Sequence, residues 1–493
     1  MAFTTPTYLL FLALIFALYW AAKKRAAQNL LLLVASYVFY AMWDSRFGAL
    51  LLGTSLLDYS VGIGLARTKH QGARRALLML SLCSNLGALA LFKYFNFFAE
   101  NFHLLARTVG WRTDPSLLKL MLPVGISFYT LKSLGYTVDV YKRRTKATTD
   151  LIAYLAYVAF FPQLLAGPID RAGNLLRQLL VGRHFVYPLA VDGCRQILWG
   201  LFKKMLLADN LAPIVQLAYG EAGSRSGPQL LLATICFAFQ IYCDFSAYSD
   251  IAIGSAKLLG IESLPNFDYP YFSKSPAEFW RRWHISLATW FRDYVYFSMD
   301  GVRGSAPRRA FNVMCTFLLS GLWHGASWNF LIWGGINGAA VLPAMLRRNQ
   351  QRRVQREQEQ QQRPGHLPSP QALLKMLLTF SFICLAWVFF RAPNLSDAIL
   401  IIKKIFIDAL NPAAYRQLTS ILHPYADYPL AGKKIMLFLC AFVLVEWTQR
   451  HRPHPLTLDD WPKPVRWLVY HGLIFLVLYF GTYFVTGFYY YQF

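Results

Sequence analysis

Apolar residues in this chain of 493 amino acids are gathered into runs long enough to cross a lipid bilayer. A helix needs about 20 residues to span the hydrocarbon core, and such runs recur from residues 6–22 to residues 467–488. Only 15% of the residues are charged, against about 25% in an average soluble domain. The sequence therefore predicts an all-α, polytopic membrane protein.

The basic residues lie mainly in the short connections between these runs, and the formal net charge is +24. Such a distribution marks cytoplasmic loops, and contact with anionic membrane lipid is a secondary role for it. No basic stretch forms a nucleic-acid recognition motif, so nucleic acid is not an expected partner. The first run lacks a preceding positive segment and is followed by three basic residues, which predicts a retained anchor with its N-terminus outside.

Loop charges and run lengths together predict a topology. The inward crossings of the N-terminal part are residues 6–22, 47–66 and 117–141, and the outward ones are residues 29–43 and 76–98. In the C-terminal part, residues 373–390 and 467–488 run outward and residues 435–447 inward, while the amphipathic residues 397–410 lie on the outer surface. About ten to twelve membrane-embedded segments result, with both termini outside.

The middle of the chain is less regular. Residues 151–169 contain FPQLLAGPI, in which Pro162, Gly167 and Pro168 interrupt any continuous helix. Irregular backbone persists at membrane depth only inside protein or beside a wet cavity, so a re-entrant or broken segment is predicted. We expect one membrane-embedded domain, residues 1–493, composed of N-terminal spans (1–149), a core (150–346), a Gln/Arg-rich cytoplasmic loop (347–370) and C-terminal spans (371–493).

A long apolar run, residues 230–259, holds acidic and hydroxyl side chains. Asp244 and Asp250 are six residues apart, with Ser246 and Tyr248 between them. On a helix the two carboxylates point in different directions, so they are expected to pair with nearby Arg, Tyr or backbone groups. Acids buried in a membrane also mark cavities, which makes all four residues candidates for lining one.

Residues 275–297 mix aromatic and charged side chains in the manner of an interfacial helix. Ser275 can cap this helix, with Pro276 in its first position. His284 follows Trp280, Arg281 and Arg282, so it contacts either a headgroup or substrate, or it has an ordinary solvated partner. Spacing alone favours the solvated alternative.

A second histidine, His324, lies in an uncharged run at residues 310–346, flanked on both sides by arginines. Both ends should therefore face the cytoplasm, and a hairpin that dips into the membrane fits best. His324 is roughly 21 Å of helix from the flank, and an ionisable group at such depth is a functional-site hypothesis by default. The alternative is a neutral histidine that hydrogen-bonds neighbouring helices.

No metal site is predicted, because the chain has no HExxH motif and no cysteines at ligand spacing. It also has no GxSxG elbow and no P-loop. A transporter or flippase for a lipid-linked saccharide remains an alternative, although no inverted repeat is found. A third alternative is that the chain is a non-catalytic scaffold for an extracellular enzyme.

Five segments, in chain order, resemble the membrane-bound O-acyltransferase family in its alginate O-acetyltransferase branch. They are LPVGISFYTLKSLGYTVDVYK (122–142), FPQLLAGPI (161–169), DFSAYSDIAIG (244–254), PAEFWRRWHISLATWFRDYVY (276–296) and GLWHGASWNFLIWG (321–334). The branch is also similar to teichoic-acid D-alanyltransferase and peptidoglycan O-acetyltransferase membrane proteins. Lys132 departs from several relatives, which carry an uncharged residue there.

The resemblance implies a helical ring around a central tunnel in the bacterial cytoplasmic (inner) membrane. His324 would be the catalytic residue at the constriction, and His284 a second functional position near the cytoplasmic entrance. A thioester donor, expected to be acetyl-CoA, would supply an acetyl group, and His324 would act as the general base. Trp323 and Asn329 are further lining candidates, and Asn329 and Tyr248 are expected to stabilise the oxyanion.

The implied acceptor is an extracytoplasmic polysaccharide, reached through a periplasmic acetyltransferase or acyl-carrying partner protein. The sequence leaves open an acylated-enzyme route, the identity of the acceptor, and D-alanyl transfer to teichoic acid in place of acetyl transfer.

Overall fold

The computed structural model describes residues 2–483, apart from residues 112–121, 300–303, 347–366, 417, 423–429 and 431. Every regular element within these ranges is a helix, which confirms the all-α prediction. Five of the described helices are long and apolar enough to cross a membrane: Arg25–Asp44, Arg46–Arg67, Gln71–Thr108, Gly227–Leu258 and Pro370–Arg391. The chain is thus a polytopic membrane protein, and ten to twelve embedded segments remain a prediction.

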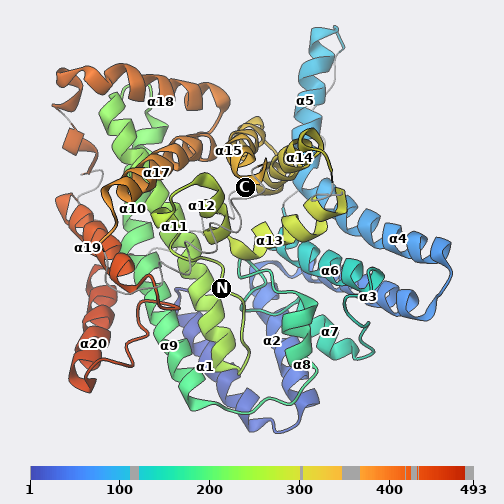
Figure 1. Cartoon of the computed structure of the whole chain (residues 1–493). Coiled ribbons are helices and arrows are strands. Elements are labelled where there is room, and N and C mark those ends of the chain that lie inside the picture. The colour runs from blue at the N-terminus through green and yellow to red at the C-terminus, as the bar shows by residue number, and fades with distance from the viewer. Residues whose placement is uncertain are drawn as a thin grey trace.

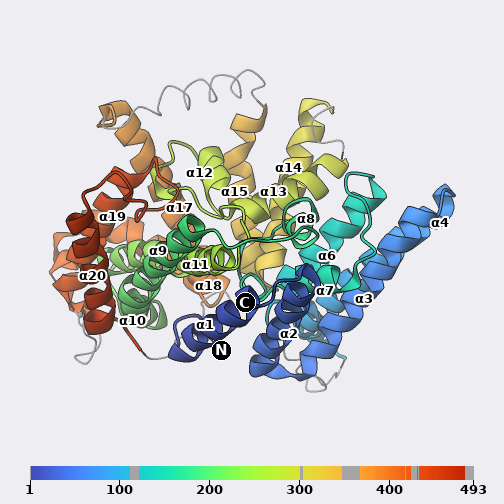
Figure 2. The same cartoon turned by 90° about the horizontal axis from the view of Figure 1, so that it is seen from below.

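The helices form two groups with a smaller set between them. Figures 1 and 2 show α2–α8 on one side, α9–α11 and α17–α20 on the other, and α12–α15 in the middle. Helix α1 belongs to the first group and lies at the boundary, where Tyr8 and Trp20 bond to α11. The first group comprises α1 (Pro6–Ala21), α2 (Arg25–Asp44), α3 (Arg46–Arg67), α4 (Gln71–Leu89), η1 (Ala90–Tyr94), α5 (Phe95–Thr108), α6 (Ile126–Tyr141), α7 (Leu151–Val158), η3 (Ala172–Leu176) and α8 (Arg177–Leu179).

The second group and the middle set contain the other α-helices that the structure describes. The second group comprises α9 (Tyr187–Leu201), η4 (Phe202–Ala208), α10 (Asp209–Gly220), α11 (Gly227–Leu258), α17 (Pro370–Arg391), α18 (Leu395–Ile407), α19 (Lys433–Gln449) and α20 (Lys463–Phe480). The middle set comprises α12 (Pro276–Arg282), α13 (Ile285–Tyr294), α14 (Ala306–His324) and α15 (Trp328–Leu346).

The predicted spans near the N-terminus are confirmed as helices α1, α2 and α3. The next helix is longer than predicted, because it continues through α4, η1 and α5 for 38 residues, Gln71–Thr108. The π-helical turn η1 lies where the helix changes direction (Figure 1), as expected of an interrupted hydrogen-bond ladder. The Gln/Arg-rich loop falls almost wholly outside the described residues, as does the end of the last predicted span.

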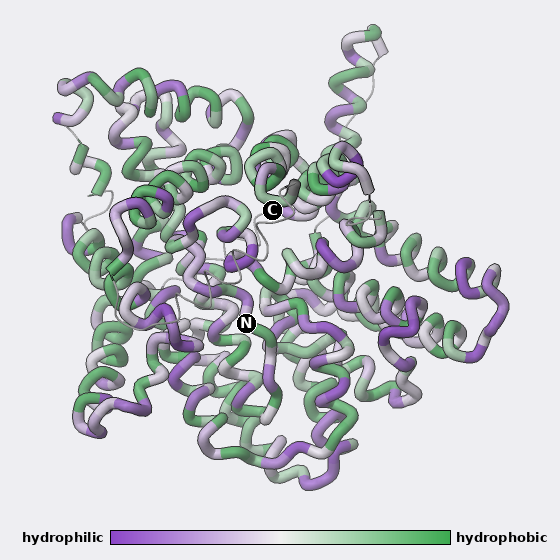
Figure 3. Tube along the Cα trace, in the orientation of Figure 1, coloured by the Kyte–Doolittle hydropathy of each residue, from purple (hydrophilic) through white to green (hydrophobic). Residues whose placement is uncertain are grey.

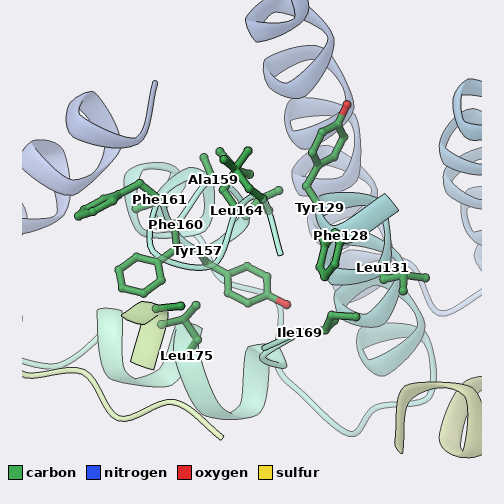
Figure 4. Packing of buried hydrophobic residues seen from close by; sticks show 14 of the residues in the cluster. Phe128, Tyr129, Leu131, Tyr157, Ala159, Phe160, Phe161, Leu164, Ile169 and Leu175 are labelled. Carbon is green, nitrogen blue, oxygen red and sulfur yellow. The ribbon is translucent and has the colours of Figure 1, made fainter. Parts of the chain in front are cut away.

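The prediction of a broken segment at residues 151–169 is confirmed. Helix α7 ends at Val158, and the chain continues in turns that are buried throughout. Figure 4 shows the Phe161 side chain of this segment pointing away from α6, and its ring packs against Phe11 of α1 (5.3 Å) and Phe39 of α2 (5.9 Å). The hydroxyl of Tyr157 donates to the carbonyls of Lys132 (3.2 Å) and Asp170 (3.3 Å). Irregular backbone is tolerated here because protein surrounds it.

Helix α11 forms the centre of the second group. It is one unbroken helix of 32 residues, and 78% of its most apolar window is buried, against 17–39% in the other four candidate spans. The helix α9, which the sequence analysis did not predict, lies directly against it. A Cβ atom on Gly254 would come within 2.5 Å of the Gly193 carbonyl oxygen, so these glycines allow the two backbones to touch.

Two clusters of buried apolar side chains meet at the middle set of helices. Trp323 and Phe128 belong to the first cluster, while Phe330, Trp333 and Trp283 belong to the second. Hydrophilic residues concentrate at helix ends and loops, for example between α3 and α4, whereas the helix bodies are largely hydrophobic (Figure 3). The α14–α15 hairpin thus bridges the two halves of the apolar interior.

Candidate active site

The hairpin predicted at residues 310–346 is confirmed. Helix α14 ends at His324 and α15 begins at Trp328, so the histidine is the last helical residue before the turn. The two helices touch through glycines, because a Cβ atom on Gly321 would lie 2.3 Å from the Phe330 carbonyl oxygen and one on Gly334 would lie 2.5 Å from that of Phe317. This close contact fixes the position of the hairpin tip.

Aromatic rings enclose the imidazole of His324, which is only 4% exposed. Its ring centroid lies 4.9 Å from Trp323, 5.0 Å from Trp333 and 5.4 Å from Phe390. Each of these rings is oriented edge-to-face with the imidazole, an arrangement that aromatic pairs favour. The histidine is therefore rigidly held within the protein.

A cavity of about 50 Å³ opens beside His324. That volume is several times the roughly 10–15 Å³ that one water requires, so a group of a few heavy atoms would fit. The cavity wall combines the hairpin tip with the start of α6; it is formed by Lys93, residues 122–128, Leu165, Trp323 and His324. The predicted lining residue Trp323 therefore faces this space.

His284 interrupts the helix that was predicted over residues 275–297. Ser275 caps α12 as predicted, but the helix ends at Arg282 and a new helix, α13, begins at Ile285. His284 has a φ of 45°, a left-handed conformation that costs a non-glycine residue about 1–3 kcal/mol. Its side chain is 2% exposed, so the expectations of one continuous helix and of a solvated partner are both wrong.

Asn266 holds this break in place. Its carbonyl oxygen accepts from the backbone N–H of Ile285 (2.9 Å), and its side-chain oxygen accepts from the backbone N–H (3.3 Å) and hydroxyl (2.9 Å) of Ser286. Its amide nitrogen donates to the hydroxyl of Ser249 on α11 (3.0 Å). These bonds offset the strain at His284 and place its ring.

The same bonds assign the tautomer of His284. Nδ1 lies 3.0 Å from the side-chain oxygen of Asn266, and that atom must be oxygen because a backbone N–H donates to it. Nδ1 therefore carries the hydrogen, and in the neutral ring Nε2 presents a lone pair. A histidine held in this form can accept a proton or a hydrogen bond.

Trp323 stands between the two histidines, which are 40 residues apart in sequence. Its ring centroid is 6.0 Å from that of His284 and 4.9 Å from that of His324. Phe128 of α6 packs against Trp323 at 5.6 Å and belongs to the cavity wall. The fold thus gathers both predicted histidines around one tryptophan.

Three other predicted residues lie on α12, beside the hairpin rather than at the cavity wall. Trp280 donates from Nε1 to the side-chain oxygen of Asn337 on α15 (3.1 Å). Arg282 forms an ion pair with Glu278 at 2.9 Å, and Arg281 is exposed. Trp280 and Arg282 therefore stabilise α12 and its packing on α15.

Asp244, Ser246 and Asp250 contact lysines of η4. Lys204 lies 2.7 Å from both Asp209 and Asp244, while Lys203 lies 2.6 Å from Asp250 and donates to Ser246 at 2.6 Å. The expectation that the acids are paired is confirmed. The expected partners were wrong, because the sequence analysis did not consider the helix that carries the lysines.

Asn329 and Tyr248 are not among the described residues of the cavity wall. Asn329 donates to the carbonyl of Ala392 at 2.9 Å, which ties the start of α15 to the end of α17. The ring of Tyr248 stacks on Phe3 at 4.3 Å. Neither arrangement supports the predicted contact with an oxyanion.

Lys93 and Tyr94 are site residues that the sequence analysis missed. Lys93 belongs to the cavity wall and donates to the carbonyls of Trp323 and His324. Tyr94 donates to the carbonyl of Leu322 at 2.7 Å. The sequence does carry a signal for Lys93, because it is the one charged residue in the apolar run at residues 76–98.

Comparison with known proteins identifies the family to which this arrangement belongs. The sequence model of the membrane-bound O-acyltransferase family matches residues 74–386, a segment that covers more than half of the chain and contains both histidines. The chain belongs to the membrane-bound O-acyltransferase family. It is accordingly an O-acyltransferase, and it is embedded in a membrane.

The relatives in this family are named for different polymers: alginate, peptidoglycan and teichoic acid. The chain is 38% identical to the probable alginate O-acetylase AlgI of Azotobacter vinelandii, over 81% of this chain and 76% of the relative. It is 34% identical to the peptidoglycan O-acetyltransferase of Helicobacter pylori, over 78% of this chain and 74% of that relative. It is 26% identical to the teichoic acid D-alanyltransferase of Streptococcus thermophilus, over 60% of this chain and 75% of that relative.

Proposed function

We propose that this membrane O-acyltransferase transfers an acetyl group from acetyl-CoA on the cytoplasmic side to an extracytoplasmic polysaccharide, with His324 as the general base. The observation that carries the proposal is the position of His324, which is buried at the end of α14 and lies in the wall of a cavity sized for a small group. Alginate is the first candidate acceptor, because relatives named as alginate O-acetylases are 38–39% identical over 81% of the chain.

In the proposed reaction an acceptor hydroxyl attacks the carbonyl carbon of the acetyl thioester. His324 removes the hydroxyl proton as the new C–O bond forms, and it returns a proton to the sulfur as the C–S bond breaks. An imidazole suits both steps because its ordinary pKa lies close to neutral pH. The products are an acetyl ester and free coenzyme A, so no other reactant is needed.

His284 is proposed as the second functional residue, near the entrance for the donor. Its Nδ1–H donates to Asn266, so the neutral ring carries its lone pair on Nε2, the form in which a histidine accepts a proton or a hydrogen bond. The charged coenzyme stays in the cytoplasm while only the acetyl group passes along a central tunnel. We further propose that the enzyme lies in the bacterial cytoplasmic membrane, with both termini outside.

The hydroxyl that reaches His324 is proposed to belong to a periplasmic partner protein, which then esterifies the polysaccharide. Peptidoglycan is the second candidate acceptor, since the Helicobacter pylori relative is 34% identical over 78% of the chain. Transfer of D-alanine to teichoic acid has weaker support, at 26% identity over 60% of the chain.

The test is the amount of alkali-labile acetate on the surface polymers of a strain that carries His324→Ala at wild-type membrane level. We expect the acetate to be lost, and the polymer that loses it identifies the acceptor. His471→Ala is the matched control, because His471 is an exposed histidine on α20, and it should leave acetate unchanged. Unchanged acetate in His324→Ala, with the protein present and folded, would eliminate His324 as the base.

A further inference from the structure

Three carbonyl groups at the end of α14 accept hydrogen bonds from another helix. A helix leaves its last four carbonyl groups without the usual partners, and those of Leu322, Trp323 and His324 are among them. The backbone N–H of Gly325 donates to Gly321 at 3.3 Å. The hydroxyl of Tyr94 donates to the carbonyl of Leu322. The ammonium group of Lys93 donates to the carbonyls of Trp323 and His324, the latter at 3.2 Å.

Both donors lie at the end of η1, the π-helical turn of the long helix Gln71–Thr108. A π turn adds a residue to the helical turn and so alters the direction of the side chains that follow, and such turns are frequent at functional sites. In this protein the turn brings two consecutive donors, Lys93 and Tyr94, to the tip of the hairpin. The long helix and the histidine that ends α14 are therefore mechanically connected.

Lys93 is a costly residue to place there, because a charged side chain within an apolar membrane segment is unfavourable. Three contacts compensate. The ammonium group lies at the negative end of the α14 dipole, where cations are stabilising, it donates to two carbonyls, and it lies 5.7 Å from the centroid of the Trp323 ring, within cation–π range.

We propose that Lys93 is a positioning residue for acyl transfer, an inference that rests on the proposed function of His324. By holding the carbonyls of Trp323 and His324, the ammonium group fixes the direction in which the imidazole enters the cavity. Tyr94 assists by holding the preceding carbonyl. The positive charge of Lys93 also forms part of the cavity wall in which the thioester would react.

The test compares Lys93→Met, Lys93→Arg and Tyr94→Phe in inside-out membrane vesicles titrated with labelled acetyl-CoA. Lys93→Met keeps the length of the side chain but not its charge or donors. It should lower kcat by about ten- to a hundredfold, the scale expected when a catalytic group is misplaced by about 1 Å, with KM changed less than threefold. Lys93→Arg should recover much of the loss, and Tyr94→Phe should have the smaller effect.

His324→Ala, assayed in parallel, separates this inference from the proposed function. If His324→Ala is inactive while Lys93→Met has the wild-type kcat, the positioning role of Lys93 is wrong and the base assignment survives. If His324→Ala is fully active, the proposed function fails whatever Lys93→Met does. Equal losses in Lys93→Met and Lys93→Arg would also overturn the inference, since a donor and cation at this position would then have no specific effect. Folded yield, measured by size-exclusion chromatography in detergent, normalises every rate.

Discussion

Two polar regions lie inside this apolar protein, and they differ in what their charged and polar groups face. Between η4 and α11, Lys203 and Lys204 meet Asp250, Asp209 and Asp244 at 2.6–2.7 Å. Around Trp323, aromatic rings and Asn266 contact the imidazoles of the two histidines, Lys93 holds the backbone beside His324, and His324 forms part of a cavity wall. Burial of an ionisable group therefore does not by itself identify a catalytic site in a membrane protein.

The difference follows from how each region offsets the cost of burial. In the η4–α11 region, opposite charges compensate one another, which stabilises the association of two helices but leaves the acids committed to their partners. In the histidine region, rings and single hydrogen bonds place imidazoles that can be neutral, so the groups can still exchange protons with a ligand. We expect substitutions in the first region to affect stability and those in the second to affect turnover.

The largest effect on stability is expected from Lys204→Met. The substitution leaves Asp209 and Asp244 buried without their shared cation, and breaking a buried ion pair costs about 3–5 kcal/mol. The apparent melting temperature in detergent and the folded yield should both fall. Turnover per folded molecule should stay close to that of the wild type.

A double-mutant cycle on the neighbouring pair sharpens this prediction. Lys203→Met and Asp250→Asn should each destabilise the protein, and the double variant should be more stable than the sum of the two losses implies, because contacting charges are coupled. Additive losses would show that the pair contributes nothing specific. If Lys203→Met or Asp250→Asn had normal stability and low turnover, the expectation that this region affects stability and not turnover would be contradicted.

In the histidine region, Asn266→Leu should lower turnover by about a hundredfold, the scale of a misplaced catalytic group. The leucine removes the acceptor that holds Nδ1–H of His284 and the clamp on Ser286. Ser249→Ala, which removes only the hydroxyl that fixes the Asn266 amide, is the milder control and should cost a few-fold. A fully active Asn266→Leu variant would show that the tautomer of His284 is irrelevant.

The hairpin offers a matched pair of adjacent glycines. In Gly334→Ala the new methyl group would meet the Phe317 carbonyl oxygen at 2.5 Å, whereas in Gly335→Ala its nearest neighbour is a Leu318 methyl at 3.7 Å. Overpacking of this kind costs about 1–3 kcal/mol, so Gly334→Ala should lower the melting temperature while Gly335→Ala should change it little. Equal effects would contradict the close contact of α14 and α15.

Features of the site that depend on neighbouring residues could be predicted from the sequence, whereas those that depend on distant contacts could not. The hairpin around His324 was predictable because flanking arginines and run length lie within one segment. The break at His284 was not, since it depends on Asn266, 18 residues upstream, and on bonds that only the folded chain forms. The lysine partners of Asp244 and Asp250 lie on η4, 40 and 47 residues earlier in the chain, and nothing in the acidic segment itself points to them.

Lys93 illustrates an intermediate case. A single charge in an apolar run is visible in the sequence, but its role depends on a π-helical turn and on a contact with residues more than 200 positions later. Residue type identified the catalytic candidates, whereas the residues that position them became apparent only from three-dimensional contacts.

The most direct test of the account is turnover per folded molecule in His324→Gln, measured beside Lys204→Met in the same membranes. Glutamine keeps hydrogen-bonding capacity but cannot act as a base. We predict that His324→Gln retains the wild-type folded yield and loses acetyl transfer by about 10²–10⁴-fold, the usual contribution of general acid–base catalysis, while Lys204→Met shows the opposite pattern. Wild-type transfer by folded His324→Gln would contradict the central claim that this buried histidine carries the chemistry.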